Sequence, residues 1–183
     1  MSTRRGQRYS TQSFKKKESA QQDPYAMRRA PQGPTVCPKC HGIFAKKRWH
    51  FDPAQYAKLE GASTTGTLLC PACRKIRDGY PEGVVTLKWP GLKAHDGEIM
   101  GLIKHVEARA LTVNPLERVM KVVKRRDAVE IQTTNDKLAQ RIGRELVRAY
   151  KGDVTYHWSH KDKLTRVDWN GPTRPEGKPR TAG

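Results

Sequence analysis

All four cysteines of this 183-residue chain lie in two Cys-Pro-x-Cys segments. Cys37 and Cys40 form the first segment, and Cys70 and Cys73 form the second. A CxxC turn lets two thiolates reach one ion, and two such turns complete the tetrahedral four-sulfur coordination that is typical of structural zinc sites. We therefore predict that these four residues bind a Zn²⁺ cofactor. Because four thiolates close the coordination sphere, the predicted site is structural and not catalytic.

Disulfides and thiol redox chemistry are the alternatives for these cysteines. Disulfides need an oxidising compartment, and residues 1–17 carry charges but none of the apolar stretch of a secretion signal. A thioredoxin-like redox motif normally occurs once, beside a βαβ pattern. The sequence therefore favours a metal site and a cytoplasmic location.

The second strong feature is a net charge of +18 with a pI near 10.1. Lys and Arg outnumber Asp and Glu in every part of the chain. Neutralising phosphates gives affinity through counterion release, so this charge favours a polyanionic partner, with nucleic acid as the first candidate. A membrane is disfavoured as the partner. The chain has no apolar run long enough to span a bilayer, and it has no amphipathic helix with Lys and Arg on one face and Trp or Phe on the other.

Composition divides the chain into four parts and predicts an α+β protein. Residues 1–34 and 170–183 are rich in polar, charged and proline residues, and are expected to be disordered basic tails. Residues 35–90 are expected to form a four-cysteine zinc-ribbon module, with a short helix from Pro53 and a short strand over residues 84–87. With few aliphatic side chains there, metal binding must supply much of the stability of this module.

Residues 91–169 are predicted to form an α-β-β-α-β-β domain with its helices on one face of an antiparallel sheet. Apolar residues at helical spacing follow Asp96, and Pro115 ends that helix. Thr134 or Asn135 caps the second helix, and Gly152 ends it. The predicted strands are residues 118–123, 128–133, 154–158 and 164–169.

Three groups of cations are candidates for nucleic-acid contacts. The first follows three- and four-residue steps along the second helix: Lys137, Arg141, Arg144, Arg148 and Lys151. The second lies on the preceding strands and their turn, and comprises Lys121, Lys124, Arg125 and Arg126. The third is Lys46, Lys47 and Arg48, beside Trp49, which we expect to pack in the core of the zinc module. A solvated helix face remains the alternative for the first group.

The sequence contains no recognisable catalytic pattern. Its six histidines do not form a site, and no HExxH or Ser/His/Asp arrangement stands out. The Gly171–Gly177–Lys178 stretch has the wrong spacing for a phosphate loop, and a proline follows Lys178. We therefore predict that the protein is not an enzyme. A nucleotide-hydrolysing enzyme is a less favoured alternative.

Several segments together resemble a known family. They are CPKC and CPAC with the Lys-Arg-Trp that follows the first turn, residues 131–134, 138–143 and 149–152. Over residues 35–169 the chain resembles a family of small bacterial zinc-ribbon proteins, and more distantly the Nmd-three family, the export adapter of the large ribosomal subunit. The resemblance implies binding to ribosomal RNA and protein near the subunit interface. The adapter has two zinc-binding cysteine quartets and this chain has one, so only the four cysteines transfer, as metal ligands.

We conclude from the sequence that the protein binds structured RNA, most plausibly as a ribosome-associated monomer. A DNA-associated transcriptional regulator is the alternative. The helix over residues 135–150 could enter a DNA groove, but two strands precede it where a helix-turn-helix would have a helix.

Overall fold

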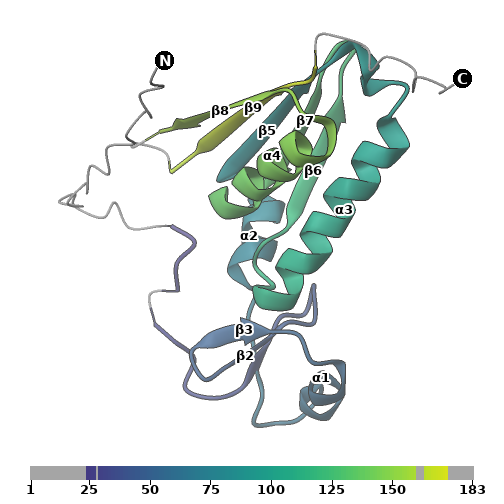
Figure 1. Cartoon of the computed structure of the whole chain (residues 1–183). Helices are drawn as coiled ribbons and strands as arrows, with labels where there is room; N and C mark the ends of the chain where they lie inside the picture. The colour runs from purple at the N-terminus through teal and green to yellow at the C-terminus, as the bar shows by residue number, and fades with distance from the viewer. Residues whose placement is uncertain (1–23, 28, 160–162, 173–183) are drawn as a thin grey trace, which may run out of the picture.

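The computed structural model describes residues 24–27, 29–159 and 163–172. The predicted tails therefore lie largely outside the described residues, as residues 1–23 and 173–183. The described part contains two sheets, with the smaller one below the larger one in Figure 1.

The small sheet contains the first cysteine segment and has very short strands. Its order is β3-β2-β1-β4, and only the β1–β4 pair is parallel. The strands are β1 (Thr35–Val36), β2 (Ile43–Ala45), β3 (Arg48–His50) and β4 (Gly66–Thr67), and α1 (Pro53–Leu59) follows β3. The predicted start of this helix at Pro53 is confirmed: Asp52 accepts a hydrogen bond from the Gln55 backbone N–H, as an N-cap does.

The large sheet has the order β6-β7-β5-β9-β8. Its strands are β5 (Gly83–Lys88), β6 (Val119–Lys124), β7 (Val129–Thr133), β8 (Asp153–Trp158) and β9 (Thr165–Asn170). Helices α3 (Asp96–Val113) and α4 (Asp136–Tyr150) cover one face, and α2 (Pro71–Asp78) lies between the two sheets (Figure 1). A short 3-10 helix, η1 (Pro90–Leu92), joins β5 to α3.

The α+β class and the predicted order of helices and strands after residue 91 are confirmed, with one correction. The sequence analysis placed the strand over residues 84–87 in the zinc module and described the second sheet as antiparallel. In the structure this strand, β5, is the central strand of the large sheet and pairs with β9 in parallel. β5 belongs to the large sheet because it alternates buried and half-buried residues, and its buried residues pack under the helices.

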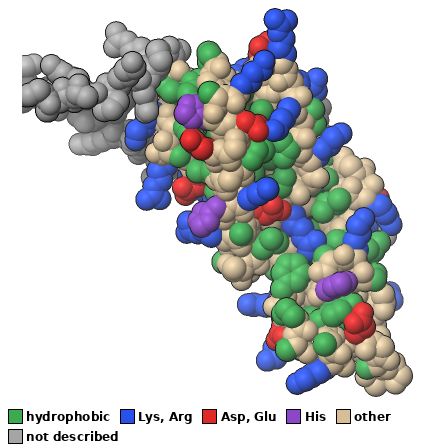
Figure 2. Space-filling model, turned by 90° about the vertical axis from the view of Figure 1, so that its right-hand side faces the viewer, with side chains coloured by type: hydrophobic (Ala, Val, Ile, Leu, Met, Phe, Trp, Pro, Cys, Tyr) green, Lys and Arg blue, Asp and Glu red, His purple; other side chains and the backbone are tan. Residues whose placement is uncertain are grey.

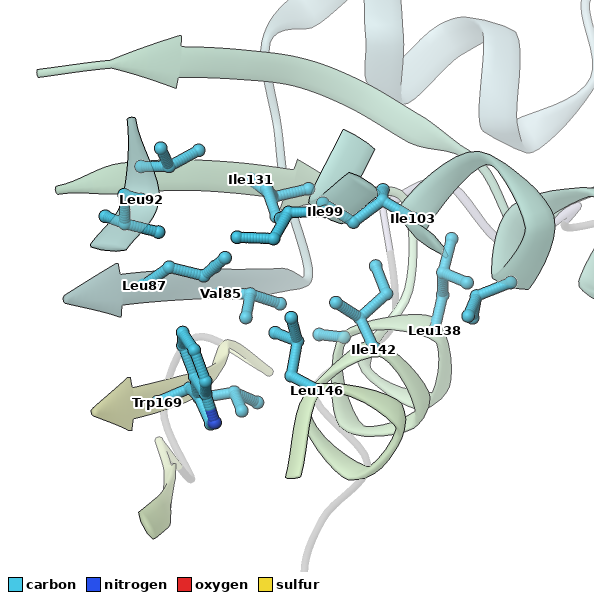
Figure 3. Close-up of a cluster of buried hydrophobic side chains, with 14 of the residues drawn as sticks. Val85, Leu87, Leu92, Ile99, Ile103, Ile131, Leu138, Ile142, Leu146 and Trp169 are labelled. Atoms are coloured by element: carbon cyan, nitrogen blue, oxygen red, sulfur yellow. The ribbon is translucent and has the colours of Figure 1, made fainter. Parts of the chain in front are cut away.

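The core of the large sheet forms where side chains of three strands meet those of two helices. Figure 3 shows these side chains pointing toward one another. They include Val85, Leu87, Ile131 and Trp169 from the sheet, with Ile99, Ile103, Leu138, Ile142 and Leu146 from α3 and α4. Asn135 caps α4 by accepting a hydrogen bond from the Leu138 backbone N–H, which fixes where this helix begins on the sheet.

Some residues that the sequence assigned to the two tails are packed against the fold. Tyr25 is buried and its ring lies 5.1 Å from that of Tyr80, while Arg74 of α2 donates a hydrogen bond to the Pro24 carbonyl. At the other end, Asn170 belongs to β9, and the Trp89 indole N–H donates to the Pro172 carbonyl. Aromatic packing therefore orders these residues, and it outweighs their polar composition.

Among the described residues, no helix combines the length and the apolar character that crossing a bilayer requires.

Gly143 of α4 marks the closest approach of that helix to the sheet. A Cβ atom there would lie 2.6 Å from Val167 Cγ1 and 3.3 Å from Val154 Cγ2. Gly143→Ala is therefore expected to destabilise the protein, because overpacking against stiff valines costs about 1–3 kcal/mol and alanine returns only about 1 kcal/mol of helix propensity. Gly101→Ala on α3 is the matched control, since a Cβ atom there would meet nothing within 4 Å. It should raise the melting temperature in the same thermal unfolding assay. Equal stabilisation by both substitutions would contradict this packing.

Candidate metal centre

The four cysteines converge on one point between the small sheet and α2. Their Sγ atoms all lie within 4.8 Å of one another, and Cys40 Sγ lies 3.7 Å from Cys70 Sγ. A tetrahedral ion with metal–sulfur bonds near 2.3 Å would place its sulfurs about 3.8 Å apart. The cysteines are free thiols, and three of the four are buried. The predicted clustering is thus confirmed, and the arrangement is compatible with a zinc site.

The first cysteine segment is a tight turn that leads into β2. The Cys37 backbone N–H donates to the Gly42 carbonyl, and the His41 N–H donates to the Cys37 carbonyl, at 2.8 and 2.9 Å. His41 has a φ of 62°, which turns the chain sharply back toward the sheet. Gly42 lets the backbone pass close to sulfur, since a Cβ atom there would lie 3.4 Å from Cys40 Sγ. This turn therefore points both of its sulfurs to one side.

The second cysteine segment opens a helix, which the sequence analysis did not predict. Cys70 is the N-cap of α2, Pro71 occupies the first helical turn, and Gly79 ends the helix in the left-handed conformation. The Cys70 sulfur accepts a hydrogen bond from the Cys73 backbone N–H at 3.4 Å. The helix N-terminus carries a partial positive charge, which offsets part of the cost of a negative charge on these two sulfurs.

The thiols of this cluster influence one another's ionisation. The hydrogen bond from Cys70 lowers the pKa of the Cys40 thiol to about 4, and the same contact raises the pKa of Cys70. Burial raises the pKa of the Cys73 thiol to about 11. Four sulfurs this close therefore share protons when no cation neutralises them, and a divalent ion would replace those protons.

Aromatic and cationic side chains enclose the cluster. Phe44 and Trp49 from β2 and β3 pack against the cysteines, with ring centroids 5.5 Å apart, so the predicted core position of Trp49 is confirmed. Arg118 lies just before β6, donates a hydrogen bond from Nη1 to Cys73 Sγ at 3.5 Å, and has its guanidinium 5.4 Å from the centre of the Phe51 ring. Four thiolates around one divalent ion would carry a net negative charge, and the positive charge of Arg118 would offset part of it.

The cluster is tied to the large sheet through buried polar contacts. Lys75 of α2 is buried, forms a 2.6 Å ion pair with Glu82 and donates to the Thr134 carbonyl. The Thr134 hydroxyl accepts a hydrogen bond from the Arg118 backbone N–H at 2.8 Å. Since Thr134 directly precedes the N-cap of α4, the position of the metal centre and the start of α4 depend on the same few residues.

The sequence analysis missed Arg118 and Lys75 as parts of the site. Each is a single cation in a chain that contains 36 Lys and Arg residues. Their roles depend on contacts with residues 45 and 59 positions away, at Cys73 and Thr134. No local pattern distinguishes such a residue from a solvated one.

The structure places the three groups of predicted nucleic-acid residues at separate positions. Lys46, Lys47 and Arg48 are exposed at the turn between β2 and β3, at the lower end of Figure 1. Lys124, Arg125 and Arg126 are exposed at the β6–β7 turn, and Lys121 is exposed on β6. β6 begins next to Arg118, close to the cysteine cluster. The β6–β7 turn follows the other end of this strand, so its cations lie at the end of the large sheet that is far from the cysteines. Figure 2 shows Lys and Arg side chains along the whole length of one face.

The cations of α4 occupy its outward side, opposite the buried residues of this helix. Lys137, Arg144, Arg148 and Lys151 are exposed. Arg141 differs, because its Nη1 lies 3.1 Å from Glu117, whose side chain is only 6% exposed. Arg141 therefore neutralises a buried carboxylate and is only partly available to a ligand.

Neither the sequence nor the structure matches a known protein in the comparisons made: no family model, no curated protein and no solved structure matches the chain. The resemblance to the ribosomal export adapter thus stays a prediction that rests on the sequence motifs.

Protein purified without added metal is expected to carry about one zinc ion per chain, as measured by elemental mass spectrometry. Cys40→Ser should lower the zinc content and the melting temperature, because metal binding supplies folding free energy in such sites. Lys39→Ser is the matched control, since Lys39 lies in the same turn with an exposed side chain. Unchanged unfolding after removal of all metal with a chelator would contradict a structural metal centre.

Proposed function

We propose that this protein is a non-enzymatic zinc-ribbon protein that binds structured RNA, and that its partner is the ribosome or a ribosomal subunit. The observation that carries the proposal is the exposed row of cations on the outward side of α4. We propose Zn²⁺ as the ion because four thiolates form a closed, soft donor set. We further propose that the protein acts as a monomer in the cytoplasm.

The α4 row has the properties of a phosphate-binding face. Its four exposed cations are spaced by seven, four and three residues, which is two turns and then one turn at a time, so they lie on one side of the helix within reach of phosphates. Of the two acids on α4, Asp136 accepts a hydrogen bond from Gln140 and Glu145 is half-buried. The outward side of α4 thus keeps a net positive charge.

The turn between β2 and β3 adds an independent argument. Ala45 pairs with Arg48, so Lys46 and Lys47 are the two central residues of a two-residue hairpin turn, with φ values of 51° and 64°. A turn with two positive φ values favours Asn-Gly, and lysine in this conformation costs roughly 1 kcal/mol per residue. Two lysines therefore occupy positions where other residues would be more stable, which supports a role in binding for their charges.

Folded RNA fits this distribution of charge better than a DNA groove does. Helix α4 lies flat on the sheet over β5 and β9, with α3 beside it, so its backbone cannot enter a major groove deeply. The cationic groups lie at both ends of the molecule and along α4, and a large folded RNA presents phosphates to several such places at once. Preference for a DNA duplex over ribosomal RNA in a direct competition assay would support the regulator instead.

Reversing the charge at two α4 positions, with Arg144→Glu and Arg148→Glu, should weaken binding to ribosomal RNA by at least about tenfold at low salt. The plot of log K against log salt should become shallower by about 1.4 to 1.8, which corresponds to two lost phosphate contacts. Both quantities follow from a fluorescence titration at several salt concentrations. Arg141 is left intact, because its reversal would leave the buried Glu117 facing a second negative charge.

The matched control for this pair is Lys104→Glu with Arg109→Glu, which makes the same change in net charge on the exposed side of α3. Its affinity should fall by much less than that of the α4 pair. Equal losses of affinity in the two pairs would mean that the α4 cations act only through the net charge of the protein and not through contacts of their own. Sedimentation of the wild-type protein only in the free fraction of a ribosome gradient at low salt would contradict the proposed partner.

A second substitution separates stability from binding at the β2–β3 turn. Lys46→Asn with Lys47→Gly should raise the melting temperature, because these residues adopt positive φ readily, and should weaken RNA binding through the loss of two cations. Lys58→Ala with Lys104→Ala removes two exposed lysines from helices and controls for the lost charge. If the Asn-Gly turn binds RNA as well as the wild type does, the lysines of this turn make no contact.

A further inference from the structure

A hollow of about 990 Å³ opens at the end of the large sheet, far from the cysteines. Three parts of the fold enclose it: the segment from the end of β5 through η1 to the start of α3, the turn between β6 and β7, and the end of β9. The volume lies at the upper limit of the 300–1,000 Å³ typical of small-ligand sites.

The position of this hollow follows from the topology of the sheet. β5 and β9 are adjacent and parallel, and their last residues, Lys88 and Asn170, are register partners. The carboxyl ends of parallel strands are where open α/β sheets bind ligands, because the chain leaves the sheet there in different directions. The N-terminus of α3, a helix of 18 residues, also faces this space through Asp96, and its N-cap His95 makes no side-chain capping hydrogen bond.

The rim of the hollow is strongly cationic. Its charged side chains are Lys88, Lys93, Lys124, Arg125 and Arg126, with Asp96 and Asp127. Lys124 and Asp96 form a 2.6 Å ion pair and neutralise each other. The remaining four cations face the single carboxylate of Asp127, so the rim attracts an anion with more than one negative charge.

One wall of the hollow is apolar and firmly held. Leu92 of η1 and Val129 of β7 line it and are 7% and 6% exposed. Beside them, Trp89 stacks on His95 with 4.9 Å between ring centroids, and its N–H bonds the Pro172 carbonyl. Since both contacts fix the Trp89 ring, the wall is formed before any ligand arrives, which lowers the entropic cost of binding.

We propose that this hollow binds a nucleoside phosphate, with the phosphate among the four free cations of the rim and the base against the Leu92–Val129 wall. The combination of a multiply charged rim with an apolar wall matches a molecule that has a phosphate at one end and a base at the other. The nucleoside phosphate in this hollow is either a free nucleotide or the 5′-phosphorylated end of an RNA. The site adds to the proposed RNA binding and does not depend on it.

The test uses the full chain and three probes in an NMR titration: adenosine 5′-monophosphate, ribose 5-phosphate and inorganic phosphate. The nucleotide should shift the backbone resonances of Leu92, Arg125 and Val129. Ribose 5-phosphate should bind about tenfold more weakly, because it lacks the apolar contact of the base. Equal affinity for inorganic phosphate and for the nucleotide would overturn the proposal, and so would the absence of shifts at these residues at millimolar nucleotide.

Variants then locate the site and identify the source of the ligand. Arg125→Glu with Arg126→Glu should weaken nucleotide binding at least tenfold, whereas Arg144→Glu with Arg148→Glu, the same charge change on α4, should change it less than twofold. The opposite ranking would overturn the proposal.

A competition experiment identifies the source of the ligand. If a 5′-phosphorylated RNA hexamer displaces the nucleotide and its unphosphorylated form does not, the ligand is an RNA end. If neither hexamer displaces the nucleotide, the ligand is the free nucleotide. Ribosome sedimentation of the same variants reports separately on the proposed function.

Discussion

The part of the chain before α2 depends on one constraint, the close approach of four sulfur atoms. Sulfurs within 4.8 Å of one another cannot all carry negative charge unless a cation lies between them. The strands around them have only two or three residues each, and sheets of that size are not stable alone. Apart from the cysteines, the buried hydrophobic side chains described before α2 are Tyr25, Val36, Ile43, Phe44 and Trp49. A metal ion bound by these cysteines would provide a fixed centre around which two turns and a short sheet take their positions.

The same constraint extends into the large sheet through a short chain of contacts. Cys73 accepts a hydrogen bond from Arg118 at the start of β6, and Lys75 of α2 reaches the Thr134 carbonyl next to the start of α4. Buried contacts of this kind lose much of their value when one partner moves, because the other is left desolvated and unpaired. The cationic side of α4 is therefore oriented relative to the metal centre by the fold itself.

The sequence predicted the elements whose signals are local and failed where the signal is distant. The helix after Asn135 follows from apolar periodicity and an N-cap, and the hairpin strands follow from alternation. The helix over Asp96–Val113 follows from periodicity alone: its predicted cap, Asp96, is the first helical residue, and His95 before it makes no side-chain capping hydrogen bond. α2 was missed because its first residues, Pro71 to Cys73, also belong to the ligand turn. β5 was recognised as a strand, but its parallel partner β9 begins 82 positions later, at Thr165, and no local pattern encodes that pairing. Among site residues, the cysteines were evident from spacing, whereas the engagement of Arg141 with Glu117 depends on burial that only the fold creates.

The distribution of charge bears on the large polyanionic partner that we propose. A net charge of +18 on 183 residues opposes folding through self-repulsion, and this cost is greatest where cations gather at one place. Here the exposed cations lie in groups at the β2–β3 turn, along α4 and at the β6–β7 turn, which lowers their mutual repulsion in the free protein. The same spacing gives one small ligand access to a single group only, whereas a folded RNA can neutralise all of them together. Lys46 and Lys47 carry this charge at the tip of the β2–β3 turn, where their φ values of 51° and 64° favour Asn and Gly instead.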